Sequence, residues 1–535
     1  MTDESRESGL SRRVFLTRVG ATGGAGAMFA TMGALGLAPS AEAATRTPFQ
    51  PPRPSDFRLR GRGAARVAVL GAGVAGLAAA YELGKAGYHV TILEAQDRVG
   101  GRNRTLRRGD RLTEIGGATQ EVRFGKDTYM NAGPARIAQW MTTMDYCREL
   151  GVPLEVFTNS NADAYIYNES AGMTRPVRWR TAKADVYGYI SELLAKATDQ
   201  GALDQRLTGT DKERLLSFLS DFGDIGRKAD GFAYRGSGRR GYSVNPGAAD
   251  QAGTVLGPVP SLSEVFASGV GRYFSFEFGY SQAMLMFQPV GGMDAIPRAL
   301  AKAVGPGKIR TGAKVTKITD KARGVEIEYQ SGGRTRSLEA DYCIATLPPH
   351  ILARIPHNLG AQVQSALSTP VPVSTGKIGL EYRGRWWEDE ENIYGGITNT
   401  DLDLATIWYP SSGYHSERGL VIGYYNFGAA ADTYARMTHA DRLRRALDQG
   451  AKIHGDRYRR NLLSSASIAW IRQPHIEGGW ISWPSLGAEY RLLNEPHGNV
   501  YFCGDWLSHE IAWQHGSFES ARKVVTELHQ RVLKS

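Results

Sequence analysis

The first regular pattern along the chain is a short apolar run, a glycine-rich turn and an alanine-rich stretch. Residues 66–70 are apolar at four consecutive positions, which predicts a buried strand. Residues 77–85 have helical spacing and end near Gly87, and residues 88–93 form a second apolar run that leads into Glu94. This order of strand, helix and strand predicts a βαβ unit.

Similar patterns continue to the C-terminus. Apolar or alternating runs predict further strands at 308–318, 340–346, 376–380, 421–425 and 500–506. Residues 518–533 predict a final helix. Helical spacing also occurs at 182–197 and 211–219, and residues 236–260 are rich in Gly, Pro and Ser. We therefore expect a helical insertion with a long loop in the middle of an α/β protein.

Composition places the chain among ordinary globular proteins. Of 535 residues, 42% are hydrophobic and 22% are charged, which excludes a disordered chain. The net charge of +10 comes from dispersed basic residues, so solubility is a simpler explanation than binding to nucleic acid or a membrane.

Three cysteines lie far apart, at 147, 343 and 503, and indicate neither a thiolate metal site nor a disulfide framework.

The N-terminus has the pattern of an export signal. Arg12 and Arg13 form a twin-arginine pair, residues 19–41 carry no charge, and the small residues Ala41 and Ala43 suit cleavage after Ala43. We predict a removable twin-arginine signal at 1–43 and a leader at 44–63, hence a secreted protein without a stable membrane anchor. The alternative is an uncleaved anchor, since 23 uncharged residues can cross a bilayer.

The turn after the first strand is a dinucleotide-binding motif. Gly71, Gly73 and Gly76 form G-x-G-x-x-G between the strand and the helix. The first glycine permits the turn, the second allows close approach of a pyrophosphate, and the third allows helix and strand to pack closely. Glu94 ends the second strand, where an acid can accept hydrogen bonds from ribose hydroxyls.

The next residues decide which dinucleotide is expected. Residues 94–105 (EAQDRVGGRNRT) match E-A-x-x-R-x-G-G-R-x-x-T, and here the chain resembles the flavin amine oxidase family, most closely its L-amino acid oxidase branch. The resemblance covers nearly all of residues 60–535. It implies FAD, a Rossmann-like FAD-binding domain of the glutathione reductase/amine oxidase type, and a mixed-sheet substrate domain with a helical insertion.

Several later segments resemble the same family. Residues 132–137 (AGPARI) resemble its G-P-x-R segment, whose backbone lines the flavin and whose arginine, here Arg136, holds the substrate carboxylate. Residues 291–297 (GGMDAIP) resemble its G-M-D-x-L-P helix start. Lys377 matches a lysine that holds a water at flavin N5. Tyr425 matches a second contact to the carboxylate.

The resemblance also implies roles near the C-terminus. Asp505 matches an acid that binds the ribityl–phosphate part of FAD, Trp513 matches an aromatic wall of the substrate pocket, and backbone at Val315 matches an adenine contact. Trp470 and Trp480 are candidates for further walls, with packing in the core as the alternative. The cofactor-binding set that we predict is Gly71, Gly73, Ala75, Gly76, Glu94, Ala95, Gly101, Arg102, Gly133, Pro134, Ala135, Arg136, Val315, Trp470, Gly504, Asp505, Ala512 and Trp513. His515 is either a gate or, more simply, a hydrogen-bonded structural histidine.

The domain organisation implied by the resemblance is discontinuous. The FAD-binding domain combines 64–125, 285–368 and 488–535. The substrate-binding domain combines 126–175 and 369–487, and a helical domain spans 176–284.

The activity implied by the resemblance is oxidative deamination of an L-amino acid. Hydride passes from the α carbon to flavin N5, and O2 is the acceptor, giving a 2-oxo acid, ammonia and hydrogen peroxide. Lys377, Arg136, Tyr425 and Trp513 are the expected catalytic residues, and Trp480 joins the last three as a substrate contact. The partners are then the amino acid and O2, with no nucleic acid, and a homodimer is expected.

Three other functions remain open from the residues. A monoamine or polyamine oxidase binds no carboxylate, so Arg136 with Tyr425 argues against it. An amino acid 2-monooxygenase would instead give an amide. A flavoprotein without enzymatic activity would give no peroxide.

Overall fold

A computed structural model describes residues 57–282 and 285–534. The predicted signal and most of the predicted leader, residues 1–56, lie outside the described residues. Among the residues that are described, no helix combines the length and apolar character needed to cross a bilayer.

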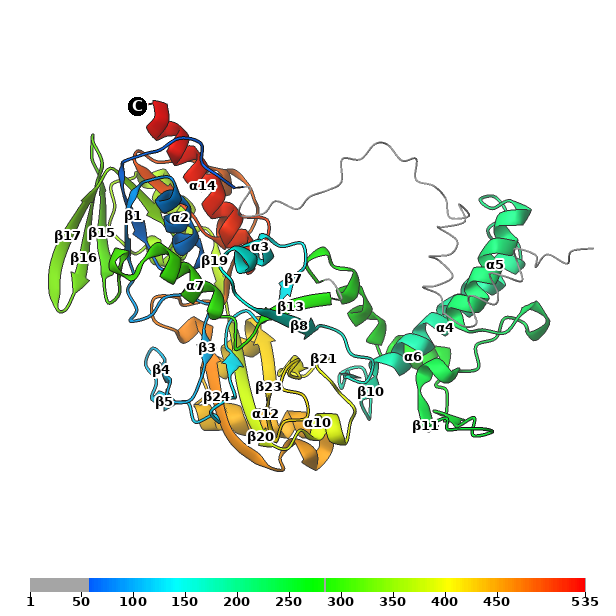
Figure 1. Cartoon of the computed structure of the whole chain (residues 1–535). Coiled ribbons are helices and arrows are strands. Elements are labelled where there is room, and N and C mark those ends of the chain that lie inside the picture. The colour runs from blue at the N-terminus through cyan, green and yellow to red at the C-terminus, as the bar shows by residue number, and fades with distance from the viewer. Residues whose placement is uncertain (1–56, 283–284, 535) are drawn as a thin grey trace, which may run out of the picture. The chain divides into compact units, whose positions relative to one another are not determined.

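The first layer is a parallel sheet of five strands, with the order β14-β2-β1-β18-β26. The central strand β1 (Arg66–Leu70) is buried at four of five positions, as its apolar run predicts. The other strands are β2 (His89–Leu93), β14 (Ile309–Arg310), β18 (Tyr342–Ala345) and β26 (Val500–Phe502). Three distant parts of the chain thus meet in one sheet (Figure 1).

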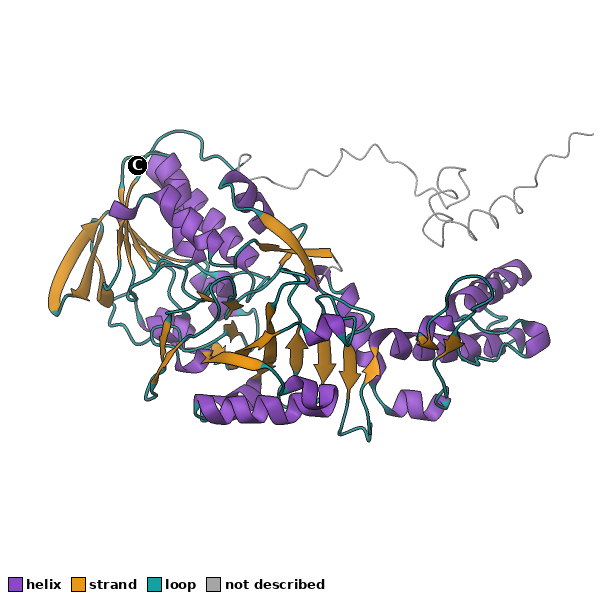
Figure 2. Ribbon diagram, turned by 60° about the horizontal axis from the view of Figure 1, so that its bottom comes forward, coloured by secondary structure: helices purple, strands orange, loops and turns teal. Residues whose placement is uncertain are grey.

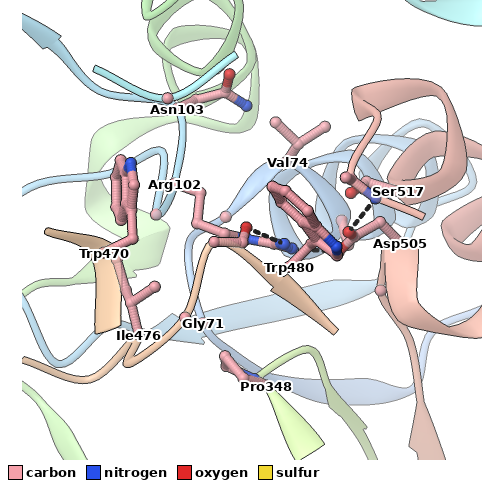
Figure 3. A pocket seen from close by; sticks show the side chains of 18 of the residues that line it. Gly71, Val74, Arg102, Asn103, Pro348, Trp470, Ile476, Trp480, Asp505 and Ser517 are labelled. Atoms are coloured by element: carbon pink, nitrogen blue, oxygen red, sulfur yellow. Dashed lines mark hydrogen bonds and ion pairs between the residues drawn. The ribbon is translucent and has the colours of Figure 1, made fainter. Parts of the chain in front are cut away.

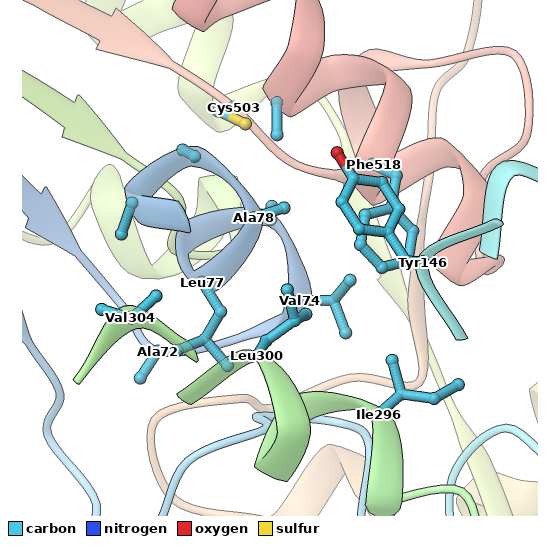
Figure 4. Packing of buried hydrophobic residues seen from close by; sticks show 14 of the residues in the cluster. Ala72, Val74, Leu77, Ala78, Tyr146, Ile296, Leu300, Val304, Cys503 and Phe518 are labelled. Atoms are coloured by element: carbon cyan, nitrogen blue, oxygen red, sulfur yellow. The ribbon is translucent and has the colours of Figure 1, made fainter. Parts of the chain in front are cut away.

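Helix α2 (Val74–Lys85) follows β1 and confirms the predicted βαβ unit. Its small apolar residues pack against α7 (Ala295–Val304) and the C-terminal helix α14 (Gln514–Lys534). Figure 4 shows Leu77 and Leu300 in this core, together with Tyr146 stacked on Phe518 at 4.1 Å between ring centroids. Tyr146 belongs to α3 (Thr142–Glu149), and α14 begins four residues before the predicted start.

The strand predicted at 308–318 is interrupted. It consists of β14, a turn, and β15 (Lys314–Asp320), which forms a separate antiparallel sheet with β16 (Val325–Ser331) and β17 (Arg334–Ala340). In the turn, Gly312 has a φ of +63° and donates to the carbonyl of Gln96, while Ala313 donates to the carbonyl of Glu94. These tertiary hydrogen bonds replace strand pairing, and the alternating sequence pattern contains no sign of them.

The second large sheet has seven strands in the order β10-β9-β21-β22-β23-β20-β24. Its longest strands are β23 (Arg418–Phe427) and β20 (Thr375–Arg383), which pair antiparallel and include the predicted strands 421–425 and 376–380. Helix α12 (His439–His454) packs on β20, β23 and β24 (Leu462–Ala469) (Figure 2). The remaining strands are β9 (Tyr165–Tyr167), β10 (Val177–Arg178), β21 (Ile397–Thr400) and β22 (Thr406–Trp408).

A helical segment joins this sheet at β10. Helix α4 (Trp179–Asp199) contains the predicted helix 182–197, and α5 (Gly209–Gly223) contains 211–219 and packs beside α4 (Figure 1). A short hairpin, α6 and a 3-10 stretch complete the segment: β11 (Tyr242–Val244), β12 (Thr254–Val255), α6 (Leu262–Ala267) and η4 (Val270–Phe278). Within 236–260, the predicted loop therefore carries one exposed hairpin.

A small sheet links the helical segment to both layers. In it, β13 (Leu285–Pro289) lies between β7 (Ile137–Ala138) and β8 (Leu154–Thr158). The shorter elements are β3 (Thr105–Leu106), β4 (Arg111–Thr113), β5 (Thr119–Glu121), β6 (Met130–Asn131), α8 (Pro349–Leu352), α9 (Ala361–Ser368), β19 (Val371–Val373), α10 (Trp386–Asp389), α11 (Gly428–Ala435), β25 (Trp480–Ser482) and α13 (Ala488–Leu493).

Candidate active site

The turn between β1 and α2 forms the floor of a large cleft. Gly71 has a φ of +102°, a conformation that favours glycine. A Cβ built on Gly76 would lie 2.1 Å from the carbonyl oxygen of Gly71, so only glycine permits this approach of helix and turn. A Cβ on Gly73, by contrast, would meet nothing within 4 Å, because Gly73 faces the open cleft.

The cleft encloses about 1290 Å³, including its opening to solvent. The N-terminus of α2 borders it at Gly73 and has no side-chain cap, so its amide groups and positive dipole can meet an anion. Glu94 lies on the same border, where its carboxylate accepts from the amides of Ala72 (2.7 Å) and Gln96 (2.8 Å). Burial raises the pKa of Glu94.

Arg102 and Asp505 pair with each other within the cleft. The Arg102 guanidinium donates to Oδ1 of Asp505 and, at 3.0 Å, to the carbonyl of Gly479, while Oδ2 of Asp505 accepts from the amide of Ala512 at 2.9 Å. Figure 3 shows Arg102 and Asp505 among the residues that line the cleft. The pairing joins the loop after β2 to the segment after β26.

A second cavity adjoins the cleft. It shares Ala95, Leu347 and His475 with the cleft and is also lined by Val315 of β15. Val315 therefore lies beside an extension of the cleft.

A cationic cluster lies beside Tyr425, which lines the cleft. Lys377 on β20 is only 2% exposed and donates from Nζ to the carbonyls of Gly133 (2.5 Å) and Asn131 (3.2 Å). Its Nζ lies 4.3 Å from the ring centroid of Tyr425. Arg136, partly buried, donates from Nη1 to Oδ1 of Asn159 at 2.9 Å.

Neither cation of this cluster has an acidic partner. The ion pairs among the described residues include neither Arg136 nor Lys377. Burial, followed by the charge of Arg136, lowers the pKa of Lys377 to about 7, and burial lowers the pKa of Arg136 to about 10. Burial also raises the pKa of Tyr425 to about 12. The cluster is therefore suited to an anion brought by a ligand.

Three residues of the cluster were missed from the sequence. The Arg136 guanidinium carbon lies 4.6 Å from the ring centroid of Trp408 and 5.2 Å from that of Phe276, and Asn159 holds one of its nitrogens. Trp408 ends the three-residue strand β22, and Phe276 lies in η4, where the sequence has no motif. Only the fold brings them to Arg136.

Most predicted site residues meet at the cleft, and a few lie outside it. The cleft is lined by Gly71, Gly73, Ala75, Glu94, Ala95, Gly101, Arg102, Gly133, Pro134, Tyr425, Trp470, Trp480, Gly504, Asp505, Ala512 and Trp513. Gly76 lies beneath the turn, Ala135 borders a neighbouring cavity with Trp408, and Arg136 and Lys377 belong to the cationic cluster. Nδ1 of His515 accepts from the backbone amide of Thr142 at 3.2 Å, and the imidazole packs edge-on against Trp140, as expected of a structural histidine.

A family model for flavin-containing amine oxidoreductases matches residues 74–529. The chain belongs to this family. The match begins at the first residue of α2. It therefore includes most residues that line the cleft of this flavin-containing amine oxidoreductase, and it includes the whole cationic cluster. The resemblance noted in the sequence is thereby confirmed.

Relatives with known names agree on the family. The amine oxidoreductase is 26% identical to a putative L-amino-acid oxidase, YobN, of Bacillus subtilis, over 87% of this chain and 94% of the relative. It is also 26% identical to an L-amino-acid oxidase of Pseudechis australis, over 85% of each chain.

Solved structures share the fold. Cyclohexylamine oxidase from Brevibacterium oxydans superposes with a TM-score of 0.59 at 19% identity, over 88% of this chain and all of that one. Wild-type putrescine oxidase bound to putrescine gives a TM-score of 0.56 at 19% identity, over 88% of this chain and 99% of that one. The expected α/β fold with a second, mixed sheet is confirmed.

The cleft residues fit the flavin cofactor that the family implies. Gly73 leaves open space where a side chain would otherwise stand, and the carbonyl of Ala132 accepts from Nε1 of Trp470 at 2.8 Å, which fixes an aromatic wall. The uncapped end of α2 supplies donors for a phosphate. The cationic cluster adjoins the same cleft through Tyr425 and Gly133.

Proposed function

We propose that the protein is a FAD-dependent L-amino acid oxidase, which converts an L-amino acid to a 2-oxo acid, ammonia and hydrogen peroxide. One observation carries the proposal: Arg136 and Lys377 are two buried or partly buried cations beside the cleft, and neither has an acidic partner among the described residues. Keeping such charges in a low-dielectric site is unfavourable unless a ligand supplies an anion. The α-carboxylate of an amino acid is that anion.

The choice of FAD over a smaller flavin follows from the length of the cleft. The cleft is lined by Tyr425, by the N-terminus of α2 and by Glu94, and the adjoining cavity is lined by Val315. Glu94 suits a ribose, the end of α2 suits a pyrophosphate, and the extension suits an adenine. A flavin mononucleotide would leave Glu94 and Val315 without a ligand contact.

The chain contributes binding and orientation. Because Asn159 occupies only one Nη1 donor of Arg136, the remaining donors can form a charge-assisted pair with a carboxylate, and the Tyr425 hydroxyl can reinforce it. Such anchoring fixes the α carbon, and positioning of this kind supplies up to roughly 7–11 kcal/mol in ideal cases. Bound FAD supplies acceptance of hydride from the α carbon and transfer of electrons to O2.

Relatives support a carboxylate-bearing substrate, because they include proteins named L-amino-acid oxidases. The shared fold with cyclohexylamine oxidase and putrescine oxidase makes simple amines the main competing substrates. The test is anaerobic reduction of the purified flavoprotein by each L-amino acid and by the corresponding decarboxylated amine. Bleaching by amino acids supports the proposal, and bleaching by amines alone overturns it.

Product analysis separates the oxidase from a monooxygenase. An oxidase gives the 2-oxo acid and stoichiometric hydrogen peroxide, whereas an amino acid 2-monooxygenase gives an amide shortened by one carbon. Mass spectrometry of the product together with a peroxide assay therefore tests the reaction type. An amide as the main product would contradict the oxidase.

We further propose that the protein is exported through the twin-arginine route, because Arg12 and Arg13 precede an uncharged stretch and Ala41–Ala43. That route carries folded proteins, which suits a flavoprotein loaded before export. N-terminal sequencing of the extracellular protein should begin at Ala44. Replacement of both arginines by lysine should retain the protein in the cytoplasm, and unchanged export would overturn the proposal.

A further inference from the structure

We propose that Trp408 is a positioning residue whose indole face stabilises Arg136 and Lys377 as cations, in place of an acidic partner, which neither has in the part of the chain that the structure describes. This inference rests on the proposed function and assigns a role to a residue that no family motif in the sequence marked. Trp408 does not have to touch the substrate in this role. It acts through the two cations.

The geometry places one ring beside both charges. The Trp408 ring centroid lies 4.6 Å from the guanidinium carbon of Arg136 and 5.3 Å from Nζ of Lys377, within the range of cation–π attraction. Trp408 is 7% exposed, so water screens this attraction little. The ring of Phe276 lies 5.2 Å from the same guanidinium carbon.

An aromatic ring serves this site better than a carboxylate. An Asp or Glu beside Arg136 would occupy its N–H donors and compete with the α-carboxylate of the substrate. The ring attracts the charge through its quadrupole and takes none of those donors, which lie in the guanidinium plane. The site therefore stays cationic and open to an anion.

The orientation of the indole is itself fixed. Nε1 of Trp408 donates to Oγ1 of Thr406 at 2.9 Å, and that hydroxyl donates to the backbone carbonyl of Tyr425 at 3.1 Å. The rings of Trp408 and Tyr425 also meet edge to face, with centroids 5.2 Å apart. The same tyrosine that borders the cleft thus holds the indole that borders both cations.

The test compares Trp408→Leu with Trp408→Phe in the flavin-loaded enzyme. Leucine removes the quadrupole and phenylalanine keeps a smaller one. The matched control is Phe157→Leu, because Phe157 is buried and packs edge-on against Trp408 at 5.8 Å, and no cation contact to its ring is recorded among the described residues. Flavin content and thermal unfolding verify that each variant is folded.

The first readout is the affinity for benzoate, a simple carboxylate, measured from the change in flavin absorbance on binding. Trp408→Leu should weaken benzoate binding by up to about 30-fold, because a guanidinium that the ring no longer holds in place must be ordered when benzoate binds, and the limit is the ratio that corresponds to about 2 kcal/mol for a desolvated cation–π contact. Trp408→Phe should recover most of that loss, and Phe157→Leu should bind as the wild type does. Unchanged binding in Trp408→Leu, or an equal loss in Phe157→Leu, would overturn the proposal.

The second readout is a pH profile, which a purely structural role would not move. Loss of the ring should make Lys377 lose its proton at lower pH, so the pH-dependent limb of flavin reoxidation should shift to lower pH in Trp408→Leu but not in Phe157→Leu. An identical profile in all three proteins would contradict the role of Trp408. Benzoate binding requires no turnover, so failure of wild-type enzyme to oxidise L-amino acids would refute the proposed function alone.

Discussion

Lys377 and Tyr425 lie directly opposite each other on the antiparallel strands β20 and β23, and Nζ of Lys377 lies 4.3 Å from the tyrosine ring centroid. Opposed residues on paired strands project to the same face of a sheet. A single pair of opposed residues in the seven-stranded sheet therefore supplies both a side chain that lines the cleft and a cation. Arg136 arrives from a different segment, between β6 and β7.

The first prediction concerns Arg136→Met, which keeps an apolar stem and removes the guanidinium. The variant should retain flavin but lose kcat/KM for L-amino acids by about 100-fold or more, since a charge-assisted pair is worth about 1.5–3 kcal/mol and positioning adds to it. Steady-state peroxide assays measure the loss. Decarboxylated amines are the control, because their weak oxidation should not fall in parallel. An unchanged kcat/KM would exclude Arg136 as the carboxylate anchor.

The second prediction concerns Lys377→Met. Lys377 contacts backbone carbonyls at Gly133 and Asn131, beside the cleft, and its Nζ lies 4.3 Å from the ring centroid of Tyr425. The variant should slow reoxidation of the reduced flavin by O2 more than it slows reduction by the amino acid. Stopped-flow measurement of each half-reaction separates the two. Equal effects on both rates would argue that Lys377 only supports the local packing.

The sequence was sufficient for the parts of the fold that depend on local pattern. The apolar run at 66–70 and the glycine motif predicted β1, the turn and α2 correctly, because burial and positive φ constrain those residues locally. The break near Gly312 was not predictable, since tertiary hydrogen bonds cause it. Trp408 and Phe276 were missed for the same reason: only strand pairing and the η4 packing bring them to Arg136.

The third prediction compares two glycines of one motif. Gly76→Ala places a methyl 2.1 Å from a backbone oxygen, so it should lower the stability of the flavin-free protein by a few kcal/mol. Gly73→Ala places its methyl in the open cleft and should leave that stability nearly unchanged while weakening flavin binding. Thermal unfolding without flavin, and flavin titration, distinguish the two effects. Equal stability of both variants would contradict the close approach of α2 and the turn.

The last prediction is a pH dependence of stability that Lys377 causes in the protein without flavin or substrate. The pKa of Lys377 falls from 10.5 in the unfolded chain to about 7 in the folded one, mainly through burial and also through the charge of Arg136. Between these values the unfolded state binds the additional proton, so the free energy of unfolding rises with pH, by roughly 1 kcal/mol per pH unit. Below about pH 7 both states are protonated, and this contribution no longer changes. Lys377→Met cannot titrate, so the stability of wild type relative to the variant should increase from pH 7 to pH 9 in urea unfolding experiments. Parallel stability curves over that range would show that Lys377 stays protonated in the folded protein.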